Sequence, residues 1–152
     1  DRCLSRGLGD VYKRQYESYP KLKAYMGQQV DFAREHGYVA TVLGRRRYLK
    51  DINSRNAIVR GAAERNAINA PIQGSAADII KLAMLNIYDK MQQENVKAQM
   101  LLQVHDELVF ECPKSELDAL KQLVKTEMEA AYSLQVPLTV DMGIGHNWLE
   151  AH

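Results

Sequence analysis

Cysteine is scarce in this 152-residue sequence, and long apolar runs are absent. Cys3 and Cys112 lie far apart and form no Cys-x-x-Cys pair, so we expect neither a zinc site nor a disulfide framework. This cysteine usage favours a reducing, cytoplasmic environment. No apolar run reaches the roughly 18 residues of a transmembrane helix, and no apolar stretch follows the charged N-terminus as in a signal peptide. The sequence therefore predicts a protein without a membrane segment.

Internal repeats and low-complexity segments are also absent, and 46% of the residues are hydrophobic. Such a chain fits one ordinary domain or a piece of a larger one. The net charge is only +1, but residues 1–60 contain 13 Lys+Arg and 6 Asp+Glu, whereas residues 61–152 contain 7 and 13. A basic half joined to an acidic half suits a protein that holds a polyanion in one place and metal cations in another. Solvated charged faces give the same pattern.

The hydrophobic periodicity, together with the Gly, Pro and capping residues between periodic segments, predicts an α+β fold. In this fold, helices are interleaved with antiparallel hairpins rather than arranged in βαβ units. A first helix is expected from Tyr19-Pro20 to a C-cap at Gly37. The further elements are a hairpin at 37–49, a kinked helix at 54–93, a hairpin at 98–112, a helix at 114–133 capped by Ser115 and Asp118, and a last strand at 137–140 with a tail to 152.

The helix at 54–93 contains two signals that argue against a continuous helix. Ser54 is a good N-cap, but Pro71 cannot donate to the carbonyl of Ala67, which predicts a kink or break. Ser75 and Asp78 then have the spacing of a capping box, which predicts that the helix restarts there.

Residues 1–15 show neither helical nor strand periodicity, and the chain does not begin with Met. We expect this segment to be disordered or foreign to the protein. The chain is then a fragment whose upstream part is missing.

The first hairpin is expected to have a basic tip. Two short runs of strand-forming residues, 38–43 and 48–49, flank Gly44 and the three arginines Arg45, Arg46 and Arg47. These arginines could grip phosphate oxygens or form a solvated turn, and both interpretations stay open.

The second hairpin places three ionisable residues between apolar runs. His105, Asp106 and Glu107 are expected at its tip, on a rigid support but open to a ligand. A carboxylate held in this way can bind a divalent metal such as Mg²⁺, which takes oxygen ligands. Asp and Glu are also ordinary solvated turn residues, so this stretch alone does not decide between the two.

A row of hydrogen-bond donors is predicted on the helix between the hairpins. Arg65, Asn69 and Gln73 recur every four residues and fall nearly on one line of a helix, over about 12 Å at a rise of 1.5 Å per residue. The minor groove of a duplex presents acceptors, purine N3 and pyrimidine O2, on every base pair. The row therefore suits sequence-independent contact with a duplex, or else it is a polar, solvated helix face.

Four stretches together resemble the family A DNA polymerases, the family of bacterial DNA polymerase I. Residues 63–78, AERNAINAPIQGSAAD, resemble the helix that follows the fingers, and residues 103–111, QVHDELVFE, resemble the motif bearing a catalytic aspartate. Residues 37–49, GYVATVLGRRRYL, look like the basic fingers hairpin, and GHNW at 145–148 with Ala151-His152 looks like the C-terminal ending. The resemblance covers about residues 16–152.

The resemblance implies an incomplete palm-and-fingers fold and template-directed DNA synthesis in replication and repair, on primer-template DNA with deoxynucleoside triphosphates. Asp106 matches the catalytic aspartate that holds Mg²⁺ at the primer 3′ end, and the complete enzyme, a monomer, uses two such ions. Glu107 matches its less essential acidic neighbour. The remaining matches contact DNA: His105 near the primer terminus, and Arg65, Asn69 and Gln73 near the newly formed base pair.

The sequence departs from the family pattern at parts that complete the site. The strand with the other catalytic aspartate and the fingers helix that binds the incoming nucleotide are absent, so the chain alone is predicted to be inactive. One alternative is a non-catalytic duplex-DNA-binding module that uses the donor row and the arginine hairpin. Another is a metal hydrolase based on residues 105–107, although no other cluster supplies a second set of ligands.

Overall fold

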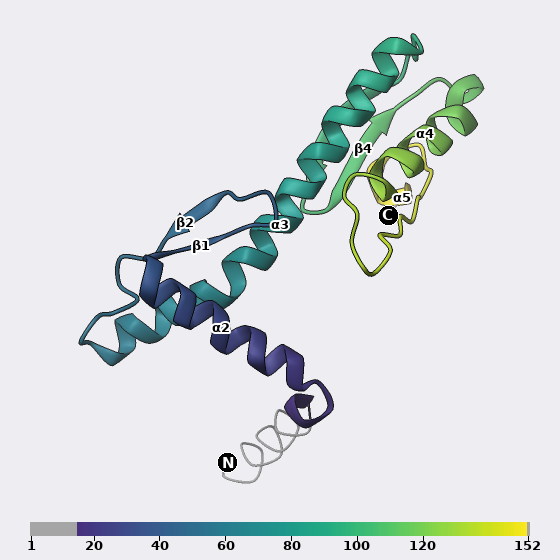
Figure 1. Ribbon diagram of the computed structural model, residues 1–152. Helices are drawn as coiled ribbons and strands as arrows, with labels where there is room; N and C mark the ends of the chain where they lie inside the picture. The colour runs from purple at the N-terminus through teal and green to yellow at the C-terminus, as the bar shows by residue number, and fades with distance from the viewer. Residues whose placement is uncertain (1–14, 152) are drawn as a thin grey trace. The chain divides into compact units, whose positions relative to one another are not determined.

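The computed structural model describes residues 15–151. Helices and two antiparallel two-stranded sheets share the chain, which confirms the α+β prediction (Figure 1). The elements are α2 (Pro20–His36), β1 (Tyr38–Ala40), β2 (Arg46–Tyr48), α3 (Ala57–Gln93), β3 (Gln99–Val104), β4 (Glu107–Glu111), the 3₁₀ helix η1 (Lys114–Glu116), α4 (Leu117–Glu129) and α5 (Trp148–Ala151). None of the described helices has the length and apolar character needed to cross a membrane.

The chain divides into two compact units, the first ending at Gly74 and the second beginning at Ser75. The boundary falls inside α3, within one turn of Pro71, so this helix contributes to both units. Each unit has a hydrophobic core of its own.

Local signals determine both ends of α2, which are the ends predicted. Pro20 begins the helix, where its missing N–H costs no intrahelical hydrogen bond. Gly37 ends it with a left-handed φ of 77°, and its N–H donates to the Ala33 carbonyl over 2.8 Å. Arg34 and His36 in the last turn lie at the negative end of the helix dipole.

The β1–β2 hairpin turns earlier than the sequence predicted. Thr41 N–H donates to the Arg45 carbonyl, and Gly44, with a φ of 80°, supplies the left-handed residue of the loop between them. Arg46 and Arg47 therefore lie in β2, opposite Ala40 and Val39, rather than at the tip. The prediction of an arginine tip was wrong because the turn closes around Gly44.

Small side chains allow the elements of the first unit to pack closely. Its core consists of Ala33, Val39, Leu49, Ile52, Ala63, Ala67 and Ala70, which come from α2, the hairpin, the following loop and α3. Ala33 and Ala67 are fully buried, since alanine lets helix backbones approach each other.

The N-cap of α3 is Asn56 rather than Ser54. The Asn56 carboxamide oxygen accepts the Ile58 N–H over 3.0 Å, which is the bond expected of an N-cap. The Ser54 hydroxyl accepts the Asn56 N–H over 3.2 Å and so supports the capping residue. The helix begins at Ala57, three residues later than the predicted boundary.

Pro71 does not break α3, and the predicted restart at Ser75 was wrong. The helix continues from Ala57 to Gln93 with Pro71 inside it. Proline removes one helical hydrogen bond, but Pro71 is buried beside Ala67 and Ala70, so packing offsets the loss. Asp78 is a buried residue within the helix rather than part of a cap at a helix start.

The second unit packs the C-terminal part of α3, the β3–β4 hairpin and α4 around one core. This core contains Ile87, Met91, Ala98, Leu120, Leu123 and Val124, with Met100, Leu108 and Phe110 of the hairpin packed against it. The register shifts between Met100 and Leu102, which leaves Leu101 as the extra residue of a β-bulge. Leu101 and Leu102 are exposed.

Two predictions near the C-terminus were wrong. The helix expected at 114–133 is the 3₁₀ turn η1 followed by α4, and the N-cap of α4, Glu116, makes no side-chain cap bond. Its carboxylate instead accepts the Lys97 N–H over 2.8 Å. Residues 137–140 form no strand, since Val140 N–H donates to the carboxylate of Glu129 rather than to a neighbouring strand.

Candidate active site and nucleic-acid interface

Asp106 lies in the turn between β3 and β4, where the sequence predicted it. Val104 pairs with Glu107 in the strand register, so only His105 and Asp106 form the turn. His105 has a left-handed φ of 54°, which is uncommon for a residue with a side chain and which occurs where the surroundings enforce it. His105 and Asp106 are exposed, so the Asp106 carboxylate is accessible to a ligand from solvent.

Gln103 stabilises this turn from within the hairpin. Its side-chain N–H donates to the backbone carbonyl of His105 over 2.8 Å. Glu107 is partly buried and already belongs to β4, so the two adjacent carboxylates have different surroundings. The arrangement presents one carboxylate, that of Asp106, on a short supported turn.

The donor row lies on the exposed side of α3 in the first unit. Arg65, Asn69 and Gln73 are exposed, whereas Ala63 and Ala67 on the same helix are buried in the core. Because α3 is continuous over this stretch, the helical spacing that the row requires is present.

The arginine hairpin and the end of the donor row meet at one cavity. A hollow of about 90 Å³ is lined by Val39, Ala40, Thr41, Arg45, Arg46, Arg47, Ala70, Pro71, Gln73 and Gly74. Arg45 donates through Nη2 to the carbonyl of Gly74 over 3.1 Å, which ties the loop end of the hairpin to α3. The structure therefore brings Gln73 together with the three arginines, which spacing along the chain did not predict.

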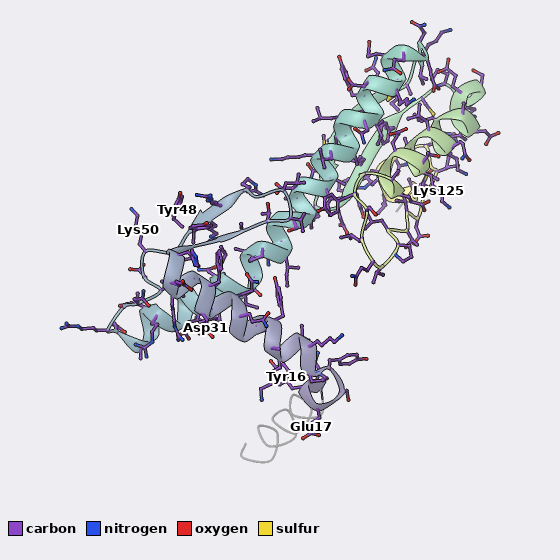
Figure 2. The ribbon with its side chains drawn as sticks, in the orientation of Figure 1. Tyr16, Glu17, Asp31, Tyr48, Lys50 and Lys125 are labelled. Carbon is purple, nitrogen blue, oxygen red and sulfur yellow. The ribbon has the colours of Figure 1, made fainter. Side chains whose placement is uncertain are left out.

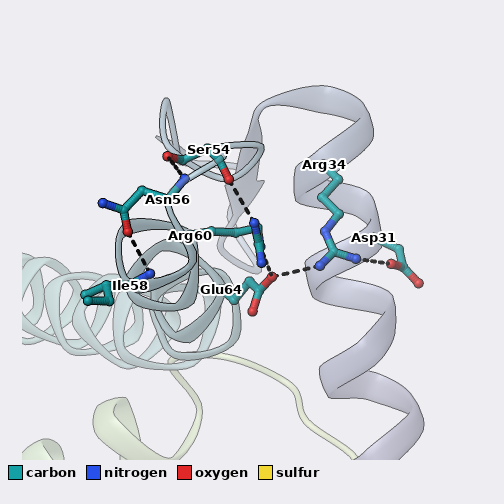
Figure 3. Close-up of polar contacts among 7 residues, drawn as sticks. All are labelled: Asp31, Arg34, Ser54, Asn56, Ile58, Arg60 and Glu64. Carbon is teal, nitrogen blue, oxygen red and sulfur yellow. Dashed lines mark hydrogen bonds and ion pairs between the residues drawn. The ribbon is translucent and has the colours of Figure 1, made fainter.

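A polar network joins α2 to the beginning of α3 (Figure 3). The Glu64 carboxylate accepts from Arg34 over 2.7 Å and lies 3.7 Å from Arg60. Arg34 also pairs with Asp31 over 3.4 Å, and Arg60 donates to the Ser54 carbonyl over 3.0 Å. The spacing of Arg60 and Glu64 at i and i+4 was a usable signal in the sequence, whereas their link to Arg34 depends on tertiary packing.

The match to known proteins extends over nearly the whole chain. Residues 6–150 match the profile of DNA polymerase family A. The chain belongs to DNA polymerase family A. The resemblance seen in the sequence motifs is thereby confirmed.

Named relatives and a solved structure agree with this family A assignment. The chain is 53% identical over 141 residues to DNA polymerase I of Caldicellulosiruptor bescii, covering 93% of this chain and 17% of that protein. It is 48% identical over 158 residues to DNA polymerase I of Bacillus subtilis, covering 99% of this chain and 18% of that protein. The POL domain of Pol1 from M. smegmatis, solved in complex with DNA primer-template and dNTP, is 48% identical with a TM-score of 0.90, over 92% of this chain and 25% of that one. The chain thus spans about a sixth of the length of the two DNA polymerase I relatives and a quarter of the solved POL domain chain.

The family A match begins ten residues before the boundary that the motifs indicated. Residues 1–15 were predicted to be disordered or foreign to the protein, whereas the family profile matches from residue 6. Residues 1–14 lie outside the described residues.

The described residues of this family A chain do not fit a complete two-ion metal site. Among residues 15–151, no group of three or more His, Cys, Asp or Glu side chains could share a metal ion. Asp106 and its neighbour Glu107 are thus at most part of a ligand set. The same finding gives no support to a metal hydrolase based on residues 105–107.

Proposed function

We propose that this chain forms part of the catalytic region of a DNA-directed DNA polymerase that extends a primer 3′-hydroxyl with deoxynucleoside triphosphates. The observation that carries the proposal is the exposed Asp106 on a supported two-residue turn, in a chain that belongs to DNA polymerase family A. Asp106 is proposed as a ligand of Mg²⁺, with Glu107 beside it. The further carboxylate that two ions need is proposed to come from outside this chain.

The first unit is proposed to bind the primer-template duplex. Arg65, Asn69 and Gln73 offer donors for minor-groove acceptors, and His105 of the second unit is proposed to lie near the primer terminus. Arg45, Arg46 and Arg47 are proposed to contact phosphate oxygens. The M. smegmatis relative, whose structure contains primer-template DNA and dNTP, supports this assignment of partners. A monomeric state and a cytoplasmic location stay predictions.

The isolated chain is predicted to be inactive because its described residues do not complete the metal site. The test adds Mg²⁺, the four dNTPs and a primed template to the purified 152-residue chain and follows primer length on a gel. We expect no templated extension, whereas a complete family A polymerase in parallel extends the primer. Extension by the isolated chain that is lost in Asp106→Asn would show that the chain completes its own site.

A duplex-DNA-binding module without catalysis is the second candidate, favoured by the exposed donor row and the arginines around one cavity. It predicts salt-sensitive duplex binding that is unaffected by Asp106→Ala and gains nothing from Mg²⁺. The polymerase proposal instead predicts that Mg²⁺ strengthens binding of primer-template with dNTP in a complete polymerase that contains this chain, and that Asp106→Ala removes this gain.

A further inference from the structure

Aromatic rings and a cation gather on one face of the β1–β2 hairpin. Tyr38 and Tyr48 are cross-strand partners, with ring centroids 5.8 Å apart at an interplanar angle of 57°. The guanidinium carbon of Arg46 lies 4.6 Å from the centroid of the Tyr38 ring, within the range of a cation–π contact. These three side chains, Tyr38, Tyr48 and Arg46, are called the aromatic face below.

The C-terminal end of α2 supports this aromatic face. Phe32 and His36 stack with centroids 4.2 Å apart, and both contact Tyr38 with steep interplanar angles, at 5.6 Å and 6.2 Å. Tyr38 is therefore held between rings and a guanidinium, whereas Tyr48 is 66% exposed. Figure 2 shows Tyr48 and Lys50 projecting from the ribbon at the end of β2. The face thus consists of an accessible ring on a fixed support.

Cationic residues flank the accessible ring along the chain. Residues 45–51 contain Arg45, Arg46, Arg47 and Lys50 against a single anion, Asp51. Within the part of the chain that the structure describes, neither Arg46 nor Arg47 has a carboxylate partner. An accessible aromatic ring among cations is the arrangement with which proteins bind single-stranded nucleic acid, since bases stack on the ring and phosphates lie near the cations.

We propose that Tyr48, supported by Tyr38 and Arg46, binds single-stranded DNA by stacking against an unpaired base. The proposal deepens the proposed polymerase function by adding a contact to unpaired nucleotides, but it requires neither Asp106 nor a metal. A duplex cannot use Tyr48 in this way, because its bases already stack on one another. A protein partner that takes Tyr48 as an apolar contact is the competing occupant, and the four cations favour a polyanion.

The test compares the affinity of the 152-residue chain for a fluorescently labelled oligo(dT) and for a duplex of equal length, by anisotropy, without Mg²⁺ or dNTPs. Tyr48→Leu keeps an apolar side chain but removes the ring, and we expect it to weaken oligo(dT) binding about tenfold and to leave duplex binding unchanged. Tyr48→Phe keeps the ring and should bind oligo(dT) almost as well as the unmodified chain. Tyr88→Leu is the matched control, since Tyr88 is 56% exposed on α3 in the other unit.

Because Tyr48 is exposed, its replacement removes no core contact, and circular dichroism checks that each variant is folded. A second measurement uses the tryptophan of Tyr48→Trp as a fluorescent reporter on the aromatic face. Its fluorescence should be quenched by oligo(dT) until binding saturates, and this quenching should exceed that of Trp148 in the unmodified chain. The proposal is overturned if the chain does not bind oligo(dT), if Tyr48→Leu leaves that affinity unchanged, or if single-stranded and duplex binding weaken equally. None of these outcomes concerns catalysis, so failure here and failure of the polymerase proposal are distinguishable.

Discussion

Gly74 lies where the hairpin approaches α3 closely. A Cβ atom at Gly74 would lie 2.6 Å from Cγ2 of Thr41 and 3.4 Å from Nη2 of Arg45. Threonine is branched at Cβ and has few rotamers, so Thr41 cannot easily turn away. The missing side chain therefore permits the Arg45 hydrogen bond to the Gly74 carbonyl and the cavity that includes Gln73.

Gly74→Ala is predicted to lower the free energy of unfolding by about 1–2 kcal/mol, because the added methyl overlaps Thr41. Gly61→Ala is the matched control on the same helix, where a Cβ would meet only Arg65 at 3.7 Å. There alanine should raise the free energy of unfolding by up to about 1 kcal/mol, through its higher helix propensity. Urea denaturation followed by circular dichroism measures both. Equal effects of the two substitutions would show that Gly74 is not required for close packing.

At the scale of elements, α3 ends in a Schellman motif built on a residue other than glycine. Asn95 has a left-handed φ of 53°, and its N–H donates to the Gln92 carbonyl over 3.3 Å. Val96 N–H donates to the Met91 carbonyl over 3.0 Å, which completes the motif. Asparagine tolerates this conformation better than most residues, but glycine adopts it without steric cost.

Asn95→Gly is therefore predicted to stabilise the chain slightly or to leave it unchanged, whereas Asn95→Ala should lower the free energy of unfolding by about 1 kcal/mol. Thermal unfolding of the two variants beside the unmodified chain gives the comparison. The prediction fails if alanine is tolerated as well as glycine, since the left-handed φ at Asn95 would then have no cost for a residue with a side chain.

The pairing of β3 with β4 determines the position of the Asp106 carboxylate. Cross-strand pairing up to Val104 and Glu107 leaves only two residues for the turn, so His105 takes a positive φ and Asp106 follows it directly. The Gln103 side chain completes the turn by donating to the His105 carbonyl. A carboxylate placed in this way needs no long loop and loses little conformational entropy on binding a ligand.

At the scale of the whole molecule, the chain covers about a sixth of its two named DNA polymerase I relatives, and the metal site proposed at Asp106 takes its further ligands from outside the described residues. In a complete polymerase that contains this chain, Asp106→Asn is predicted to reduce the rate of primer extension roughly a thousandfold. The reason is that a neutral amide replaces the anionic carboxylate of the proposed metal ligand. The measurement is the single-turnover rate of dNTP incorporation at saturating DNA.

The control for this prediction is Asp118→Asn, which removes the same charge from the exposed first turn of α4 and should leave the rate unchanged. A rate for Asp106→Asn within tenfold of the unmodified enzyme would remove Asp106 from the proposed metal site.

Features that depend on neighbouring residues could be predicted from the amino-acid order alone. The ends of α2 follow from Pro20 and Gly37, the spacing of Arg65, Asn69 and Gln73 follows from helical geometry, and the place of Asp106 in a tight turn follows from the apolar runs on either side. The motifs were long enough to indicate the family. These are interactions over a few residues, and their signals lie within a few positions of each other.

Features that depend on contacts between distant segments could be read only from the folded chain. Pro71 remains inside α3 because it is buried beside Ala67 and Ala70, and no local pattern reports that packing. The arginines of β2 meet Gln73 because Gly74 lets the hairpin approach the helix. Residues 137–140 form no strand, and the Val140 N–H donates to the Glu129 side chain of α4 instead. In each case, tertiary packing outweighs the intrinsic preference of the residues for a secondary structure. One lost or gained backbone hydrogen bond contributes only about 1 kcal/mol to the free energy of unfolding.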